Sequence, residues 1–320
     1  MIPLYRDESA LDAILERCAP VLERYAPAEL VLVDDGGGAD RTTTRAISLA
    51  GNYPHAVTVV RLARNFGQHP AVFAGLEHAR GDIVVTLDSD LQYPPEDIPK
   101  LVDRVTPEVP VVSGYRADRR DPFPRSLVTR TITNYLNRKT GTQLRDFGSM
   151  FRAYDRSTVD RMLQLTERHR YVPAVVAWLG VPIEEVPVAH AARGEKGSRY
   201  RLSTLLDLLL DLVTGYSVAP MRWLTGVGLA AAFIGFLITA FFAVYRVVAG
   251  DGGAGAVSAF AGLFALSTIQ LLLLAVISEF IGRIYTEAKG RPYYLTAELW
   301  RSDAAGVEAA PERVPAARPV

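Results

Sequence analysis

The chain has 320 residues, and its 35 lysines and arginines balance its 35 aspartates and glutamates. This length accommodates one medium-sized catalytic domain and a smaller second part, and the zero net charge gives no indication of a nucleic-acid partner. The single cysteine, Cys18, excludes an internal disulfide framework and a multi-cysteine zinc site.

The first 200 residues alternate predicted helices with short apolar strands. Apolar side chains at helical spacing indicate helices over 9–25, 41–51 and 70–79. Apolar runs indicate strands over 29–33, 57–62, 82–87 and 109–113. This alternation predicts an α/β domain with a mostly parallel sheet that helices cover on both faces. Ligands of such sheets bind at the carboxyl ends of the strands, where Asp34–Asp35 and Asp88–Asp90 lie.

Two charge-free runs follow, at 223–245 and 252–278. Each is longer than the about 20 apolar residues that cross the hydrocarbon core of a membrane, so we predict two transmembrane helices. The preceding residues 202–216 are apolar with a narrow polar edge. That pattern is typical of a helix in the membrane interface, and equally of a helix packed on the catalytic domain.

Basic residues predict how the two spans are oriented. Arg222 precedes the first span, and Arg283 and Lys289 follow the second, whereas the connecting loop has only Arg246. The positive-inside rule then places the catalytic domain and both termini in the cytoplasm, in a multi-pass protein of the cell membrane. We expect no signal peptide, because the charged residues 6–8 interrupt the start of the chain.

The most informative residues end the apolar strand DIVVTL. They are Asp88, Ser89 and Asp90, followed by Leu-Gln-Tyr-Pro-Pro. Two carboxylates in this arrangement can bind Mg²⁺ or Mn²⁺ and, through the ion, a diphosphate. A bound ion would neutralise the charge that builds up on a nucleoside-diphosphate leaving group. We therefore predict that Asp88 and Asp90 are metal ligands.

Short motifs connect this acidic pair with a known family. They are IPLYRDE at 2–8, VDDG at 33–36, RNFG at 64–67, AGL at 74–76, GD at 81–82, DSDLQYPP at 88–95 and RDFGSMFRAY at 145–154. Together they resemble family 2 glycosyltransferases of the GT-A fold, in particular the polyprenyl-phosphate branch. The resemblance extends to about residue 295. It implies a Rossmann-like catalytic domain, an interfacial helix and two transmembrane helices.

The resemblance also implies the reaction and its partners. A nucleotide sugar, most simply a UDP-sugar with GDP left open, would donate its sugar to polyprenyl phosphate at the cytoplasmic face. Relatives of this kind suggest a homotetramer. Two alternatives remain open: a non-catalytic membrane scaffold or nucleotide-sugar sensor, and a processive polysaccharide synthase. The second usually carries Gln-x-x-Arg-Trp, whereas residues 219–223 have the Arg-Trp without the Gln.

Roles on the donor side follow from the same resemblance. Asp88 and Asp90 would hold the metal and the diphosphate, and Gln92 would lie beside the sugar. Asp35 would contact the base or ribose, whereas a structural role in the turn is favoured for Asp34. The remaining residues of the nucleotide pocket would be Pro3, Tyr5 and Asp7, with ordinary packing as the alternative for Tyr5.

Two basic segments would bind the phosphates of the acceptor and of the donor. By resemblance, the acceptor phosphate would bind Arg116, Arg125 and Ser126. The loop covering the donor diphosphate would include Arg193, Lys196 and Arg199. Arginine suits phosphate because its planar fork donates paired hydrogen bonds. The alternative is a basic surface that faces anionic lipid.

The expected mechanism is direct displacement at the anomeric carbon, with inversion. The second pKa of a phosphate monoester is near 6, so the acceptor is already largely anionic at neutral pH and needs no strong base. Asp146 would act either as a general base or as a residue that orients the sugar. Positioning and charge neutralisation of two anionic reactants are the larger demands.

We expect four parts: a catalytic domain at 1–200, a juxtamembrane helix at 201–221, a two-helix membrane region at 222–285, and a cytoplasmic tail at 286–320. The tail should be largely disordered after about residue 301 because it is rich in alanine and proline. Only Met1 and Ile2 precede the Pro-x-Tyr motif. The first strand is therefore expected to be nearly absent, from a late start or a truncation, with its ladder partners unpaired.

Overall fold

The predicted alternation of helices and strands is present in the structure. The computed structural model describes residues 1–116, 133–134, 137–138, 141, 144–167, 170–189, 219–249 and 254–302. The strands are β1 (Ile2–Leu4), β2 (Glu29–Asp34), β3 (Ala56–Leu62), β4 (Ile83–Thr86), β5 (Val111–Arg116), β6 (Arg152–Asp155), β7 (Ile183–Val188) and β8 (Thr296–Ser302). The helices are η1 (Glu8–Ala10), α1 (Leu11–Arg24), α2 (Thr42–Ala50), α3 (Gln68–His78), η2 (Pro95–Asp97), α4 (Ile98–Val102), α6 (Arg156–Gln164), α7 (Val172–Trp178), α9 (Ala219–Ala249) and α10 (Ala254–Ala288). The three helices and four strands predicted before residue 114 are thus confirmed as α1 to α3 and β2 to β5.

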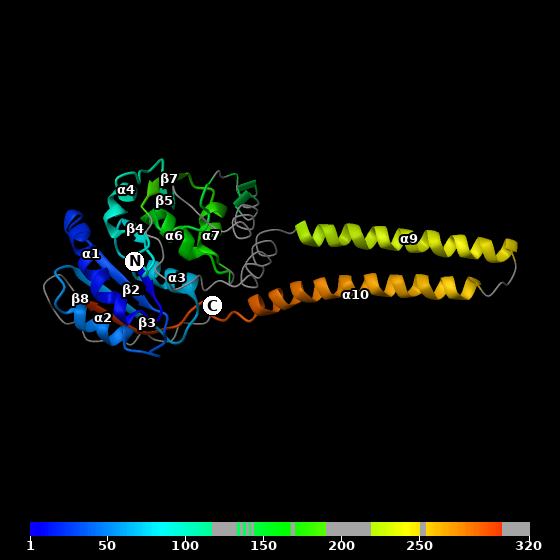
Figure 1. Cartoon of the computed structure of the whole chain (residues 1–320), viewed down its shortest axis with the longest axis horizontal. Coiled ribbons are helices and arrows are strands. Elements are labelled where there is room, and N and C mark those ends of the chain that lie inside the picture. Colours follow the sequence, from blue (N-terminus) through cyan, green and yellow to red (C-terminus); the bar gives the residue numbers. More distant parts are fainter. Residues whose placement is uncertain are drawn as a thin grey trace. The chain divides into compact units, whose positions relative to one another are not determined.

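The chain divides into two compact units (Figure 1). The first, which we call the sheet unit, comprises Met1–Leu205 and Arg291–Val320. The second, the hairpin unit, comprises Leu206–Gly290. The chain therefore leaves the sheet unit and returns to it after the hairpin unit.

The sheet unit contains two four-stranded sheets, ordered β1-β2-β3-β8 and β4-β6-β5-β7. In the first sheet β1, β2 and β3 are parallel and β8 is antiparallel to β3. In the second, β6 is antiparallel to both of its neighbours, and only β5 and β7 are parallel. The α/β class is confirmed, but the expectation of a mostly parallel sheet is corrected to mixed sheets. The sequence missed β6 because its residues, Arg-Ala-Tyr-Asp, carry no apolar run.

Strand β1 connects the two sheets. Its residues Ile2 to Leu4 pair with Leu32 to Asp34 of β2. On its other side, the amino group of Met1 donates to the carbonyl oxygen of Val85 at 2.7 Å, and the carbonyl of Met1 accepts from the amide of Leu87 at 3.0 Å. The expectation that this strand is nearly absent, with its partners unpaired, is wrong for residues 2–4, because three residues are enough to form the ladder.

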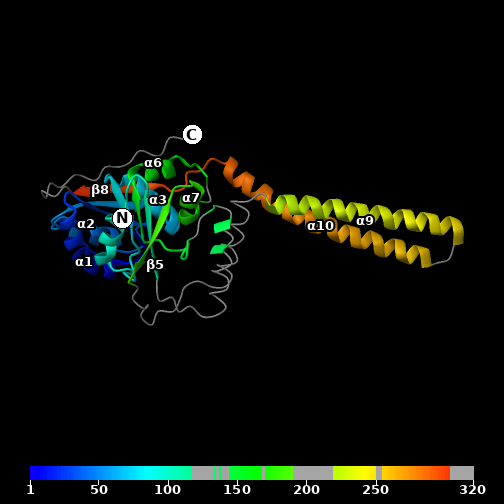
Figure 2. The same ribbon diagram turned by 90° about the horizontal axis from the view of Figure 1, so that it is seen from above.

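Side chains of alternate strand residues feed two hydrophobic cores. In β2, Leu30 and Leu32 face α1 and α2, whereas Val31 and Val33 face α3 and the side of α6 and α7. This period of two is what a strand buried on both faces requires. The helices therefore cover the sheets from both sides (Figures 1 and 2).

Strand β8 fixes the segment that follows the hairpin unit. Glu298 accepts hydrogen bonds from Arg61 of β3, the shorter at 2.5 Å, and Trp300 is buried against the α1 side. The guanidinium of Arg170 lies over the rings of both Phe73 and Tyr293, 4.3 and 4.2 Å from their centroids. The strand was not predicted, and its residues were expected to form part of the tail, because a strand after two long apolar helices gives no local sign of its partner.

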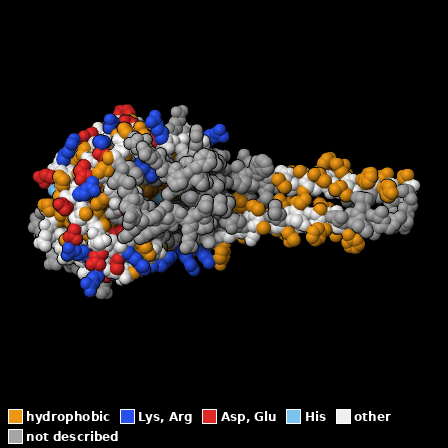
Figure 3. Space-filling view, in the orientation of Figure 1, with side chains coloured by type: hydrophobic (Ala, Val, Ile, Leu, Met, Phe, Trp, Pro, Cys, Tyr) orange, Lys and Arg blue, Asp and Glu red, His pale blue; other side chains and the backbone are white. Residues whose placement is uncertain are grey.

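The hairpin unit consists of two long helices, α9 and α10, of 31 and 35 residues. Figure 3 shows hydrophobic side chains along the visible face of both helices. Among the described residues, one segment is long and apolar enough to span a membrane, Gly262–Ala288, and the apolar stretch Gly226–Ile238 is shorter. Both predicted segments are helical, and the prediction of two membrane spans stays a prediction. The predicted interfacial helix at 202–216 lies outside the described residues.

Replacing Trp300 tests whether β8 stabilises the sheet unit. Trp300 is 6% exposed, so Trp300→Ala is expected to lower the free energy of unfolding by about 3 kcal/mol through lost burial and a cavity. Unfolding in detergent, followed by circular dichroism with increasing urea, measures the change. Trp178→Ala is the matched control, because Trp178 is 58% exposed and its loss should change stability by less than about 0.5 kcal/mol. Equal effects of the two variants would contradict the structural role of β8.

Candidate active site

Charged side chains gather at the carboxyl edge of the strands. Asp34 and Asp35 end β2, and Asp88 to Asp90 follow β4. Arg116 ends β5, and Asp146 precedes β6, which runs in the opposite direction. Because β1 is paired with β2 and also bonded to the β4 segment, these ends lie at the same edge of the sheet unit. The edge is the one at which ligands of α/β sheets bind.

Asp34 stabilises the turn after β2. Its side chain is fully buried and accepts a hydrogen bond from the amide of Gly36 at 2.7 Å and another from the hydroxyl of Thr43. A Cβ atom on Gly36 would lie 2.8 Å from the carboxylate, which explains the glycine. The predicted structural role of Asp34 is confirmed by these contacts.

Asp35 holds the turn between β3 and α3. Its Oδ1 and Oδ2 accept hydrogen bonds from the amides of Phe66 and Gly67, at 2.7 and 2.8 Å. The residue is only 4% exposed, and burial raises the pKa of its carboxyl group to about 6 against the pull of these hydrogen bonds. Gly67 has a φ of 103°, which L side chains rarely adopt, so the turn requires glycine there.

The acidic pair is held by contacts of its own. Gln68, the first residue of α3, donates from Nε2 to Oδ1 of Asp88 at 2.7 Å. Asp90 accepts the amide of Gln92 at 3.2 Å, and the intervening Leu91 has a φ of 51°. Asp90 is exposed and Asp88 half-buried, so both carboxylates are accessible from solvent.

These two carboxylates fit a divalent ion that also binds substrate. Among the described residues, no group of three or more His, Cys, Asp or Glu side chains could hold a metal by itself. Mg²⁺ and Mn²⁺ prefer oxygen ligands, and Mg²⁺ is typically bound by one or two carboxylates together with water and substrate phosphates. Asp88 and Asp90 are sufficient for such a site if a diphosphate completes it.

The predicted nucleotide residues lie against the acidic pair. Oδ2 of Asp7 accepts hydrogen bonds from the amide of Tyr5 at 3.2 Å and from the hydroxyl of Ser89 at 2.6 Å. The ring of Tyr5 is 37% exposed, which leaves it free to stack on a base. The guanidinium of Arg6 lies 5.5 Å from the centre of this ring. Pro3, within β1, is half-buried.

Asp146 and Arg116 form an ion pair. Nε of Arg116 lies 2.9 Å from Oδ2 of Asp146, and their side chains are 23% and 5% exposed. The carboxylate of Glu185 on β7 accepts the backbone amides of Arg145 and Asp146, with shortest distances of 2.8 and 3.1 Å. Glu185 thereby fixes the backbone that carries Asp146, a role that the sequence alone did not indicate.

Tyr93 follows the acidic pair in the chain and is buried. Its buried ring stacks on Phe151, with centroids 5.4 Å apart. Burial raises the pKa of its hydroxyl group, and the charges that act on it include Arg116, Asp146 and Asp88. The other predicted residues, Arg125, Ser126, Arg193, Lys196 and Arg199, lie outside the described residues.

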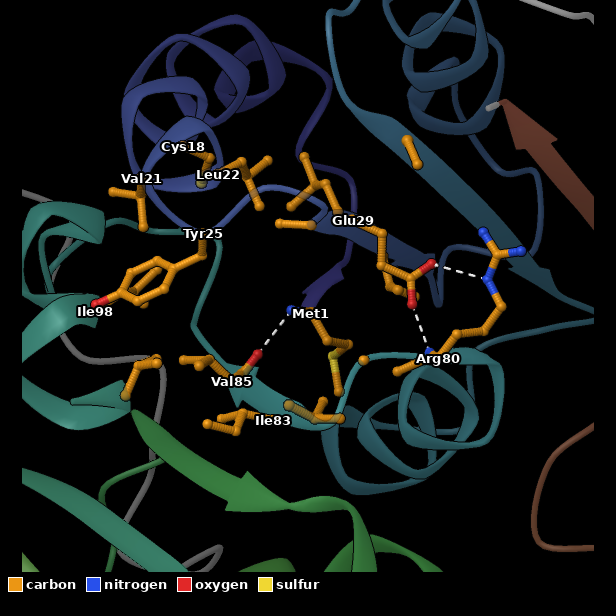
Figure 4. Close-up of a pocket in the computed structure, with 18 of the residues that line it drawn as sticks. Met1, Cys18, Val21, Leu22, Tyr25, Glu29, Arg80, Ile83, Val85 and Ile98 are labelled. Atoms are coloured by element: carbon orange, nitrogen blue, oxygen red, sulfur yellow. Dashed lines mark hydrogen bonds and ion pairs between the residues drawn. The ribbon is translucent and has the colours of Figure 1, made fainter. Parts of the chain in front are cut away.

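A cavity of about 500 Å³ lies at the opposite edge of the sheet unit (Figure 4). It is lined by Met1, Cys18 and the first residues of β2 and β4, and the ion pair between Glu29 and Arg80 lies at its border. Burial raises the pKa of the Cys18 thiol to about 11, which leaves it an unreactive thiol at neutral pH. The cavity contains no residue of the acidic pair, so we do not place the chemistry there.

Comparison with known proteins finds relatives along almost the whole chain. Residues 1–163 match glycosyl transferase family 2. Undecaprenyl-phosphate 4-deoxy-4-formamido-L-arabinose transferase of Pseudomonas aeruginosa strain UCBPP-PA14 is 39% identical over 317 residues, covering 98% of this chain and 93% of that protein. The protein of the same name from Serratia proteamaculans strain 568 is 36% identical over 302 residues, 93% of this chain and 92% of that protein. Among solved structures, glucosyl-3-phosphoglycerate synthase from Mycobacterium tuberculosis matches with a TM-score of 0.47 and 20% identity, over 67% of this chain and 78% of that one.

The raised pKa of Asp35 makes stability depend on pH. The folded protein binds a proton at Asp35 near pH 6, whereas the unfolded chain binds it only near pH 4. The stabilisation that comes from protonated Asp35 is therefore complete below about pH 4 and is lost as the pH rises through about 6. Melting temperatures between pH 4 and 6.5 should therefore fall more steeply with pH for the wild type than for Asp35→Asn. Asp12→Asn, which removes an exposed carboxylate, should keep the wild-type slope. Identical slopes in wild type and Asp35→Asn would contradict the assignment.

Proposed function

The chain belongs to glycosyl transferase family 2, and from that premise we propose that it transfers a sugar from a nucleotide sugar to polyprenyl phosphate, with inversion at the anomeric carbon. The sheet unit has the GT-A fold of that family, and the chain is a glycosyltransferase. The observation that carries the proposal is the hydrogen bond from the hydroxyl of Ser89, which lies between Asp88 and Asp90, to Asp7, at the same edge of the sheet unit as the Arg116–Asp146 ion pair. This arrangement offers one place for a nucleoside diphosphate and one for an acceptor phosphate.

On the donor side, Asp88 and Asp90 would hold Mg²⁺ or Mn²⁺. The bound ion would supply charge neutralisation for the leaving diphosphate. Tyr5 would stack on the base, and Asp7, which accepts a hydrogen bond from the Ser89 hydroxyl, would line the nucleotide pocket. Gln92, directly after Asp90, would lie beside the sugar. Asp35 has both carboxylate oxygens occupied by backbone amides, so a contact with the nucleotide would use its remaining lone pairs.

On the acceptor side, Arg116 is the described residue best placed for a phosphate. Its Nε donates a hydrogen bond to Asp146, and a planar guanidinium held in this way is the kind of donor that binds phosphate. A lipid phosphate that is already anionic needs orientation more than deprotonation. We therefore assign Asp146 to the orientation of Arg116 and of the sugar rather than to general-base catalysis. Arg125 and Ser126 are proposed as further phosphate ligands, and Arg193, Lys196 and Arg199 as a loop over the diphosphate.

The hairpin unit would keep this site at a membrane. Residues before and after it belong to the same sheet unit, so α9 and α10 must leave and re-enter on one side of any bilayer. An even number of crossings follows, and two helices of 31 and 35 residues are long enough for one crossing each. With the positive-inside bias, this supports a cytoplasmic sheet unit and cytoplasmic termini in the cell membrane.

The first donor to test is the sugar named by the relatives. The similar proteins, which match this chain over nearly their whole length, are named for 4-deoxy-4-formamido-L-arabinose and undecaprenyl phosphate. We propose this pair, with UDP as the nucleotide, as the first of a panel that also contains UDP-hexoses and GDP-mannose. Lipid products resolved by mass would identify the sugar and separate a single transfer from polymerisation.

Removing one carboxylate of the acidic pair tests the metal assignment. Asp90→Asn keeps the size of the side chain but weakens metal binding, so turnover with Mn²⁺ or Mg²⁺ should fall by at least about 100-fold. Sugar transfer to undecaprenyl phosphate in detergent is the measurement. Asp160→Asn, which removes an exposed carboxylate on α6, should keep full activity. Full metal-dependent activity in Asp90→Asn would refute the assignment, and an inert wild type with every donor would favour the scaffold alternative.

Cysteine labelling in intact cells tests the even number of crossings. In a Cys18→Ser background, Gly252→Cys between the two helices should react with a membrane-impermeant maleimide added outside. Lys289→Cys, after α10, should react only once the cells are lysed. Labelling of both positions from outside, or of neither, would contradict a two-span hairpin with cytoplasmic ends.

A further inference from the structure

We propose that Gln68 is a positioning residue that orients Asp88 toward the divalent ion, and that Asp35 holds Gln68 in place through the turn of residues 66–68. The inference rests on the proposed function, because it gives Asp88 the role of a metal ligand. It connects Asp35, which follows β2, with Asp88, which lies just after β4.

The first part of the link is rigid. Asp35 accepts the amides of Phe66 and Gly67 with separate oxygens, so its carboxylate restrains two successive peptide groups. The φ of 103° at Gly67 turns the chain sharply into α3, and the carbonyl of Gly67 accepts the amide of Ala71 at 3.2 Å in the first turn of that helix. The backbone of Gln68, immediately after Gly67, is therefore fixed both by Asp35 and by the helix.

The second part of the link is a single hydrogen bond. Nε2 of Gln68 lies 2.7 Å from Oδ1 of Asp88, at the mouth of the site. A carboxylate on a short side chain can rotate, and a donor fixed on one oxygen restricts that rotation and so sets the direction in which the carboxylate faces a cation. Hydrogen-bond partners of metal ligands act in this way, and their removal commonly weakens metal binding by about 10- to 100-fold.

The side chain of Gln68 is suited to this role and to little else. The residue is exposed, so its hydrogen bond contributes little to the stability of the fold. The neutral amide donates to Asp88 without cancelling its negative charge, which a lysine or arginine would do. A glutamate would place a second negative charge beside Asp88 and offer no donor at neutral pH. The length of the side chain also matters, because asparagine is one methylene group shorter and its amide falls short of Asp88.

The test measures Mn²⁺ affinity directly, in the full chain in detergent. Free Mn²⁺ is quantified by electron paramagnetic resonance during titration in the presence of saturating UDP, or GDP if the wild type binds Mn²⁺ more tightly with it. Gln68→Leu should weaken Mn²⁺ binding by about 10- to 100-fold and leave the melting temperature unchanged. Gln68→Asn should be similarly weak, because its amide falls short of Asp88. Gln164→Leu, at the end of α6, is the matched control and should bind Mn²⁺ as the wild type does.

A double-mutant cycle tests the role of Asp35. If Asp35 acts through Gln68, Asp35→Asn should weaken Mn²⁺ binding, and combining it with Gln68→Leu should add little to the effect of Gln68→Leu alone. Additive losses would overturn the link to Asp35. Should Asp35→Asn not fold, Phe66→Pro removes one of the two amides that Asp35 accepts and takes its place in the cycle.

The outcomes separate this inference from the proposed function. A wild type that binds Mn²⁺ with UDP or GDP but transfers no sugar would refute the proposed reaction. The same titration would still test the role of Gln68. Mn²⁺ binding by Gln68→Leu within about twofold of the wild type would overturn the inference while the reaction stands. A wild type that binds no Mn²⁺ under any condition would overturn both.

Discussion

The arrangement of the site depends on a strand of three residues. Ile2 to Leu4 pair with β2, the carbonyl of Leu4 accepts the amide of Asp35, and Met1 bonds to Val85 and Leu87 beside β4. These backbone hydrogen bonds align the carboxyl ends of β2 and β4. Asp35 and Asp88, which follow these strands, therefore lie at the same edge of the sheet unit. A buried backbone group without a partner is costly, so the pairing also fixes the register of the two sheets.

At this edge, negatively charged carboxylates are held by hydrogen-bond donors. Within the described residues, Asp7 accepts from Ser89, Asp88 from Gln68, and Asp146 from Arg116. A nucleoside diphosphate that approached Asp88 and Asp90 without a cation would meet two carboxylates of its own sign. A divalent ion between them would turn this repulsion into attraction, and neutral donors such as Gln68 leave the carboxylates charged. The ion pair at Asp146 holds the guanidinium of Arg116, which we propose as a ligand of the acceptor phosphate, at the same edge.

The chain returns to the sheet unit through β8. The ladder between β3 and β8, the Arg61–Glu298 ion pair and the contacts of Arg170 with the rings of Phe73 and Tyr293 anchor the residues that follow α10. If the hairpin unit spans a membrane as proposed, an acceptor confined to that bilayer would meet the site without diffusing through solution, which favours transfer by proximity.

Much of this protein was readable from the sequence alone. The apolar runs before Asp34 and Asp88 predicted β2 and β4, because residues buried on both faces of a sheet leave a local signal. The acidic pair and the charge-free helical segments were equally local, and the motifs around them identified the family. The tertiary structure alone decided the partners: β6 and β8 run antiparallel to their neighbours, Glu185 holds the backbone before Asp146, and Gln68 reaches Asp88. The physical reason is that each of these contacts joins residues at least 20 positions apart, which periodicity and spacing along the chain do not encode.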